Sequence, residues 1–194
     1  MKNARQGGRE AILKAAVRLF AEKGFTGAST REICQAAGIT KPMLYYHFRG
    51  KEHLYQELII DCFSQHQKVL LRASQAGGTF RERLVRIMET TLKSAREDPW
   101  RVRFLTRMVF SPEEQRPRLN VVARLEDERA FLTGVFQNGV AAGLVRGKPR
   151  ELATVTMGMS LITILANLFT GKPALNRRDA EKLVGVLLDG CAAE

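Results

Sequence analysis

The chain has 194 residues, 45% of them hydrophobic and 26% charged, so it is long enough for one sizeable core or for a small domain joined to a larger one. Its formal net charge is +11, and residues 1–50 carry nine basic against three acidic side chains, which favours a polyanionic partner over a merely solvated basic surface. The three cysteines form no Cys-x-x-Cys pair, which excludes a disulfide framework and a thiolate zinc site, and without an N-terminal signal peptide we expect a cytoplasmic protein with reduced thiols.

Apolar side chains recur at intervals of three and four residues along the chain, and no stretch alternates with a period of two. The sequence therefore predicts an all-α fold. A further helix start is signalled at Ser111-Pro112-Glu113-Glu114, although Pro117 soon interrupts it. The expected helices span residues 9–23, 29–37, 41–48, 51–74, 80–97, 99–110, 118–142, 149–170 and a last stretch after residue 176.

Capping residues mark several of these predicted helix ends. Ser29 with Glu32 three residues later is the pattern of a capping box. Asp98 followed by Pro99 is typical of an N-cap with a first-turn proline, and Asn176 is a further N-cap. The glycines expected to end helices are Gly24, Gly77, Gly78 and Gly143.

Residues 29–51 have the pattern of a helix-turn-helix, two short helices joined by a turn that contains glycine. Gly38 can adopt the left-handed conformation that ends one helix and lets the next begin. Leu44 and Phe48 lie four residues apart on the inner side of the second helix. The apolar face of the first helix consists of Ile33, Cys34 and Ala37. A helix-turn-helix in a basic region predicts that the second helix enters the major groove of DNA.

The outer face of that second helix carries groups suited to DNA contact. The side chains expected to meet base edges are Lys41, Pro42, Met43 and Tyr46. Pro42 and Met43 have only apolar contacts to offer, for example to thymine methyl groups. The hydrogen-bond donors to phosphate oxygens are Tyr45, Tyr46 and His47, with added charge from Lys41 and Lys51. The alternatives are packing of the two tyrosines against the first helix and a merely exposed His47.

The segments ASTREI (28–33), AGITK (37–41), LYYHF (44–48) and KE (51–52) resemble the DNA-binding domain of the tetracycline-repressor (TetR) family of transcriptional regulators. The resemblance implies a bacterial DNA-binding domain in residues 1–50 and a larger helical domain in residues 51–194 for effector binding and dimerisation. The positions that match phosphate contacts in the family are Thr30, Thr40, Tyr45, His47 and Lys51. Gly50 departs from the serine that often precedes the lysine, and glycine caps a helix less firmly.

The resemblance also implies an effector pocket in the larger domain. The candidate residues on its helices are Phe63, Met88, Trp100, Phe104, Arg107, Met108, Phe131 and Phe136. Aromatic and methionine side chains suit a small hydrophobic ligand, and Arg103 and Arg107 could meet an acidic group on it. The alternative for each is an ordinary place in a helical core, and for the two arginines a solvated face.

Residues 152–171 carry no charge and have the length of a membrane span. However, polar residues recur along one helical face at Thr156, Ser160, Thr163, Asn167 and Thr170. We therefore expect a helix buried between its own domain and a second subunit rather than in a bilayer. The resemblance implies a homodimer through the last two helices, with candidate interface residues Val155, Met159, Ile162, Leu165, Phe169, Leu183 and Leu187.

No catalytic motif emerges, and we expect neither enzymatic activity nor a cofactor. Cys62 and His66, four residues apart, are two ligands without a third, so no metal site is predicted. The leading hypothesis is a homodimeric repressor released from a palindromic operator on double-stranded DNA by a small hydrophobic effector. The alternative is an architectural or partner-regulated DNA-binding protein without an effector.

Overall fold

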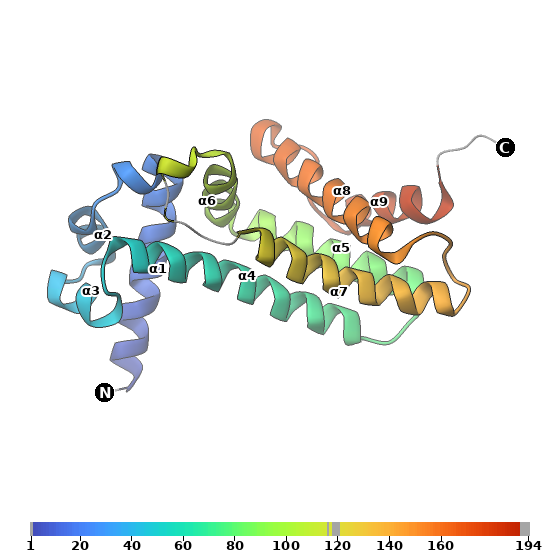
Figure 1. Cartoon of the computed structure of the whole chain (residues 1–194), viewed down its shortest axis with the longest axis horizontal. Coiled ribbons are helices and arrows are strands. Elements are labelled where there is room, and N and C mark those ends of the chain that lie inside the picture. The colour runs from blue at the N-terminus through green and yellow to red at the C-terminus, as the bar shows by residue number, and fades with distance from the viewer. Residues whose placement is uncertain (1, 116, 118–120, 191–194) are drawn as a thin grey trace. The chain divides into compact units, whose positions relative to one another are not determined.

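The computed structural model describes residues 2–115, 117 and 121–190, and within them it contains helices and no strands, which confirms the all-α prediction. The elements, shown in Figure 1, are α1 (Lys2–Gly27), α2 (Thr30–Ala37), α3 (Lys41–His47), α4 (Lys51–Gln75), α5 (Phe80–Glu97), α6 (Pro99–Phe110), the 3₁₀ turn η1 (Glu113–Gln115), α7 (Val121–Ala141), α8 (Pro149–Thr170) and α9 (Arg177–Asp189).

The chain forms two compact units. Unit 1 comprises Met1–Ser64 and Asp98–Leu119, and unit 2 comprises Gln65–Glu97 and Asn120–Glu194. The units do not divide at residue 50, where we placed the domain boundary. Unit 1 also takes in the first part of α4 and the whole of α6, because α6 packs along α1.

The predicted capping residues are confirmed. Ser29 and Glu32 form a capping box at the start of α2, and Asp98 accepts a hydrogen bond from the Arg101 amide at the start of α6. Asn176 caps α9, with Asp179 completing a second capping box. At these three points the sequence pattern predicts the helix start to the residue.

Two predicted elements differ from the structure. The segment after Ser111 forms only the short turn η1 instead of a helix, because Pro117 follows too closely for a helix to propagate. Helix α1 begins at Lys2 rather than residue 9, and its backbone leaves helical geometry at Gly24 (φ 72°, ψ 179°) before a last turn to Gly27. The predicted start of α7 at residue 118 and the residue Cys191 lie outside the described residues.

The core of unit 1 is built around aromatic rings from three helices. Tyr55 of α4 lies edge-on to Phe20 of α1 and to Phe104 of α6, with ring centroids 4.9 and 5.2 Å apart. Phe25, near the end of α1, adds a third edge-on contact to Tyr55 at 5.2 Å. Aromatic pairs at these separations stabilise a core beyond the area they bury. They tie α1 to both α4 and α6.

In unit 2, α5 packs against α8 and α9, and α8 packs along α7. The inner face of α8 includes Ala153, Thr156 and Ser160. The two hydroxyls donate to carbonyl oxygens one turn earlier in the same helix, at 2.8 Å each, so their burial leaves no hydroxyl unpaired. The polar stripe of this helix therefore faces inward along its first part.

Among the described helices, α8 is the one long and apolar enough to cross a membrane by length and composition.

Candidate DNA-binding interface

The helix-turn-helix adopts the predicted geometry. Gly38 ends α2 in the left-handed conformation (φ 65°), and the following Ile39 amide donates to the Cys34 carbonyl at 3.0 Å. Leu44 and Phe48 are fully buried and hold α3 against the helices beneath it. Figure 1 shows α2 and α3 together beside α1 in unit 1, which agrees with their contacts.

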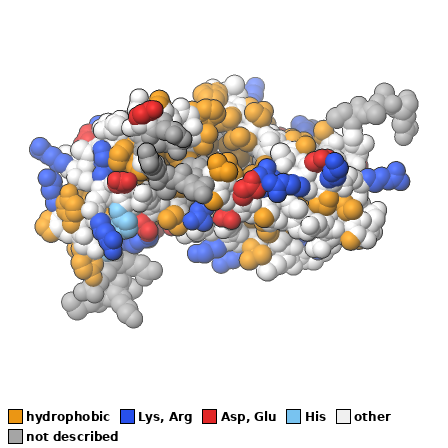
Figure 2. Space-filling model, viewed as in Figure 1, with side chains coloured by type: hydrophobic (Ala, Val, Ile, Leu, Met, Phe, Trp, Pro, Cys, Tyr) orange, Lys and Arg blue, Asp and Glu red, His pale blue; other side chains and the backbone are white. Residues whose placement is uncertain are grey.

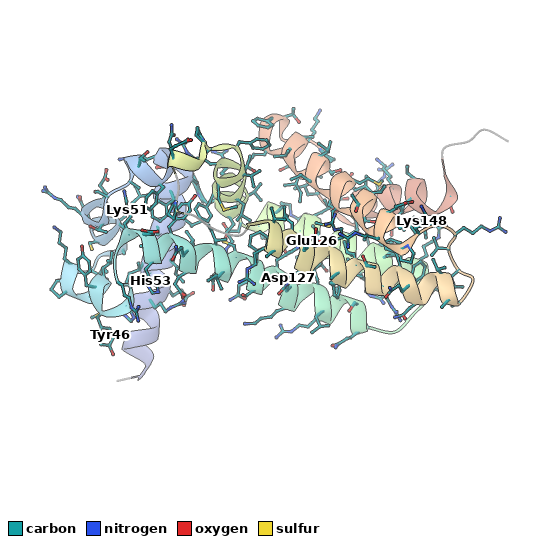
Figure 3. The ribbon with its side chains drawn as sticks, viewed as in Figure 1. Tyr46, Lys51, His53, Glu126, Asp127 and Lys148 are labelled. Carbon is teal, nitrogen blue, oxygen red and sulfur yellow. The ribbon has the colours of Figure 1, made fainter. Side chains whose placement is uncertain are left out.

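The outer face of α3 is exposed, as expected. Tyr45 and Tyr46 are 53% and 62% exposed, so the packing alternative does not hold for their rings as a whole. Figure 3 shows Tyr46 projecting from α3, and Figure 2 shows Lys and Arg side chains among hydrophobic ones at this end of unit 1. The remaining residues predicted for base edges are also exposed: Lys41, Pro42 and Met43.

The two predicted threonine contacts lie at helix starts. Thr40 is the N-cap of α3, and its side chain makes no capping hydrogen bond, so the hydroxyl is not used for the helix. Thr30 begins α2 and is half-buried. Both positions suit a hydroxyl that donates to phosphate.

His47 is half-buried and turned towards α1. Its Nε2 atom is buried without a hydrogen-bond partner among the described residues. A Cβ atom placed on Gly8 of α1 would lie 3.4 Å from this nitrogen. In this conformation Nε2 is therefore not available to a phosphate.

The Lys51 ammonium is engaged within unit 1. Its Nζ donates to the carbonyl oxygens of Phe25 and Ala28, at 2.9 and 3.1 Å, and lies 4.4 Å from the centre of the Phe25 ring. Figure 3 shows Lys51 where α4 begins. Two of the three N–H donors of this ammonium are therefore used within unit 1. The backbone amide of Lys51, in the first turn of α4, remains suited to a phosphate.

His53 is a capping residue that sequence reasoning missed. Its Nδ1 accepts a hydrogen bond from the Arg49 amide at 3.2 Å. The Leu54 amide donates to the Gly50 carbonyl at 3.0 Å, which makes Gly50 the N-cap of α4. The imidazole thus reaches back over the helix start to the amide of the residue before the N-cap, one residue earlier than in a capping box. The sequence signal that could have identified this contact is His53, a polar side chain with an acceptor nitrogen, three residues after Gly50, which has no side chain to cap the helix.

The predicted effector residues fall into two groups, one in each unit. In unit 1, Phe104 packs in the aromatic core, and Trp100 lies beneath the guanidinium groups of Arg18 and Arg103. Arg107, expected to meet a ligand, donates instead to carbonyl oxygens at the end of α1. The others of this group are Met108, buried, and Phe63, half-buried.

The second group is packed in unit 2. The Ser160 hydroxyl oxygen lies 3.1 Å from the sulfur of Met88, and the ring of Phe136 lies edge-on to Phe80. Phe131 is half-buried on α7. These contacts give each residue a place in a helical core. None of the eight predicted effector residues lines either of two open grooves on the described surface.

The predicted dimer residues lie on α8 and α9, and three of those on α8 are exposed apolar side chains. Ile162 and Phe169 are 65% and 78% exposed, and Val155 is exposed as well. A shallow groove of about 450 Å³ lies along this surface, lined by Val155, Gly158, Met159, Ile162, Thr163 and Leu183. Leu165 and Leu187 are half-buried. We call this surface the α8–α9 face.

The described residues contain no group of three or more potential metal ligands. Burial raises the pKa of the Cys62 thiol to about 12. His66 lies opposite Glu128 of α7, with 3.5 Å between Nε2 and Oε1.

Residues 12–58 match a family described as bacterial regulatory proteins, tetR family. IcaR of Staphylococcus epidermidis, a negative transcriptional regulator of a biofilm operon, is 36% identical over 64 residues, which are 33% of this chain and 35% of that protein. The transcriptional repressor KstR2 of Mycolicibacterium smegmatis is 26% identical over 71% of this chain and 67% of its own length. Among solved structures, AibR in complex with isovaleryl coenzyme A and operator DNA has a TM-score of 0.71 at 25% identity, covering 93% of this chain and 98% of that one.

Proposed function

We propose, because the chain belongs to the TetR family of bacterial regulatory proteins, that it is a sequence-specific transcriptional repressor released from its operator by a small hydrophobic effector. The observation that carries the proposal is the exposed face of α3, set on a helix-turn-helix whose turn and buried side are intact. Since its target is DNA, the protein acts in the cytoplasm.

In the proposed complex α3 lies in the major groove of DNA. Lys41 and Tyr46 offer hydrogen-bond donors to base edges, and Met43 offers apolar contact to thymine methyl groups. Thr30, Thr40, Tyr45, His47 and the Lys51 amide contact phosphates and set the register of the protein on the duplex.

The α8–α9 face supports a homodimer. Its apolar side chains lie exposed on a protein whose sequence carries a large net charge, and such a surface is normally covered by a partner. A two-fold axis through this face would present two α3 helices to a palindromic operator, with half-sites about 34–36 Å apart or more.

The effector is proposed to be small and hydrophobic, and an acyl-coenzyme A is the first probe to test. AibR, which shares the fold along nearly its whole length, is bound to isovaleryl coenzyme A in its solved complex. An effector that favours one arrangement of the helices over another would shift the population away from the one that fits the operator.

Footprinting of the purified protein on DNA flanking its own gene tests the proposal. A protected palindrome at nanomolar protein, lost in Tyr46→Ala, is the expected result. Addition of isovaleryl coenzyme A, and then of longer acyl chains, should remove the protection. Diffuse and strongly salt-dependent binding at every sequence would overturn the specific-repressor proposal and favour the architectural alternative.

A further inference from the structure

The geometry points to Lys51 and Arg107 as positioning residues that hold the turn between α1 and α2, rather than as groups that touch DNA or effector. We call residues 21–28 the α1–α2 corner. The inference rests on the proposed DNA-binding function, because the corner carries α2, and through it α3. Lys51 of α4, Arg107 of α6 and the corner itself all belong to unit 1.

The corner exposes backbone carbonyl groups that need partners. At Gly24 the backbone turns to φ 72° and ψ 179°, which interrupts the helical hydrogen bonds of α1. Within the corner, the Ala28 amide bonds the Gly24 carbonyl at 3.3 Å. Carbonyl oxygens at a helix end carry partial negative charge and are stabilised by cations.

Arg107 of α6 supplies one cation. Its Nη1 donates to the Glu22 carbonyl at 2.9 Å and more weakly to the Ala21 carbonyl at 3.4 Å. A Cβ atom on Gly24 would lie 3.0 Å from Arg107 Nε, so the glycine also leaves the space that the guanidinium occupies. The break in α1 and the approach of Arg107 therefore depend on the same residue.

Lys51 of α4 supplies the second cation. Its ammonium bridges the Phe25 and Ala28 carbonyl oxygens and also lies against the Phe25 ring. Ala28 directly precedes Ser29, the N-cap of α2. An ammonium held by two carbonyl oxygens and an aromatic face sets the start of α2 relative to α4.

The two cations thus bind successive parts of one corner from two different helices. Tyr55 of α4 packs on Phe25 within the corner, and Tyr55 and Phe104 of α6 both pack on Phe20, which directly precedes the corner. A shift of α4 or α6 has to move the corner, and with it the angle at which α3 meets DNA.

Charge-removing substitutions with matched controls test this. Lys51→Gln and Arg107→Gln are compared with Lys41→Gln, exposed on α3, and with Arg103→Gln, one turn from Arg107 on α6. The first readout is hydrogen exchange of residues 24–40 in the protein alone, which needs no DNA. Lys51→Gln and Arg107→Gln should speed exchange there by about tenfold, and the two controls should not.

The second readout is binding to the footprinted operator and to a scrambled duplex at several salt concentrations. Lys51→Gln and Arg107→Gln should weaken operator binding about tenfold, with scrambled binding and the salt slope unchanged, because they alter register rather than phosphate contact. Lys41→Gln, which removes a charged group in contact with DNA, should instead lower the salt slope by about one ion, because fewer counterions are then displaced. Arg107→Lys and Lys51→Arg, which keep a cation, should retain part of the affinity that the glutamine variants lose. In a protein that already carries Tyr46→Ala, adding Arg107→Gln should cause little further loss of affinity, because both substitutions act through α3.

Three results would overturn the inference. One is a salt slope reduced by one ion in Lys51→Gln with unchanged exchange, which would make the ammonium a phosphate contact. Another is an additive loss with Tyr46→Ala, which would indicate general destabilisation. The third is corner exchange that no charge-removing variant alters. The parent protein and all variants could also bind operator and scrambled duplex equally well, while hydrogen exchange still speeds up in Lys51→Gln and Arg107→Gln. In that case the proposed function fails, but the positioning role of the two residues at the corner stands.

Discussion

Lys23 of α1 and Glu32 of α2 form an ion pair, with 2.6 Å between Nζ and Oε1. The other carboxylate oxygen of Glu32 accepts hydrogen bonds from the Ser29 amide and hydroxyl, at 2.9 and 2.7 Å. One carboxylate therefore completes the capping box of α2 and also ties α2 to α1. These contacts, with the Lys23 ammonium first, lower the pKa of Glu32 from 4.5 to about 2.

This lowered pKa predicts an acid-sensitive step in the stability of unit 1. A carboxylate with a lowered folded-state pKa contributes stability that is complete above about pH 4.5 and is lost as the pH falls towards 2. Glu32→Gln should therefore be less stable than the parent at pH 7 and equal to it near pH 2. Urea unfolding followed by circular dichroism at pH 7, 4 and 2.5 measures the difference. A constant difference between the two proteins across this range would contradict the assignment.

Tyr46→Ala should weaken operator binding by about 10–100-fold and reduce discrimination between operator and scrambled duplex. The side chain is largely exposed on α3, so the urea midpoint should stay close to that of the parent. Leu144→Ala removes a side chain of similar exposure that follows α7 and should alter neither property. Fluorescence anisotropy with a labelled operator gives both affinities. Parent-like operator binding by Tyr46→Ala would contradict the docking of α3 proposed above.

Local patterns predict most of this fold because the interactions concerned are local. A capping box is decided by residues three apart, as at Ser29 and Glu32, and the turn at Gly38 requires a left-handed backbone that glycine adopts readily. The burial of Leu44 and Phe48 follows from helical periodicity. These features place α2 and α3 correctly before any tertiary contact is known.

The same patterns do not predict where long cationic side chains go. Lys51 and Arg107 find carbonyl oxygens 23 or more positions away in the chain, and residue type alone does not indicate such a partner. Gly24 signalled a helix end, and so a group of free carbonyls, but not which cation would bind them. In α8 the spacing of Thr156 and Ser160 identified a polar face. This polar face can be buried because the Thr156 and Ser160 hydroxyls donate to carbonyl oxygens of their own helix, and the spacing alone does not predict that burial.

Ile162→Glu should dissociate the proposed homodimer. Ile162 is 65% exposed on the α8–α9 face, and an ionised carboxylate buried there without a partner should raise the dimer dissociation constant by more than about a hundredfold. Phe110→Glu, at a similarly exposed apolar position on α6, is the control and should leave the dimer intact. Sedimentation velocity across a concentration series measures both. A dimer that persists in Ile162→Glu would place the interface elsewhere, and recovery of the untagged parent with membranes would favour a bilayer as the partner of α8.

Two glycines of α7 should respond in opposite directions to the same substitution. At Gly134 an added Cβ meets nothing within 4 Å, so Gly134→Ala should stabilise the protein by about 0.5–1 kcal/mol through reduced freedom of the unfolded chain. At Gly139 an added Cβ would lie 2.4 Å from Cζ of Phe80, at the start of α5. That ring packs edge-on against Phe136, which restricts its movement away from the new methyl group.

Gly139→Ala should therefore destabilise the protein, because the overlap costs about 1–3 kcal/mol and exceeds the gain in helix propensity. Urea unfolding of both variants and the parent gives the two differences on one scale. Gly139→Ala combined with Phe80→Leu, which shortens the opposing side chain, should lose less than the sum of the two single losses, since the added methyl group then has room. Equal stabilisation by both alanines would mean that α5 and α7 do not approach each other at Phe80 and Gly139 in solution.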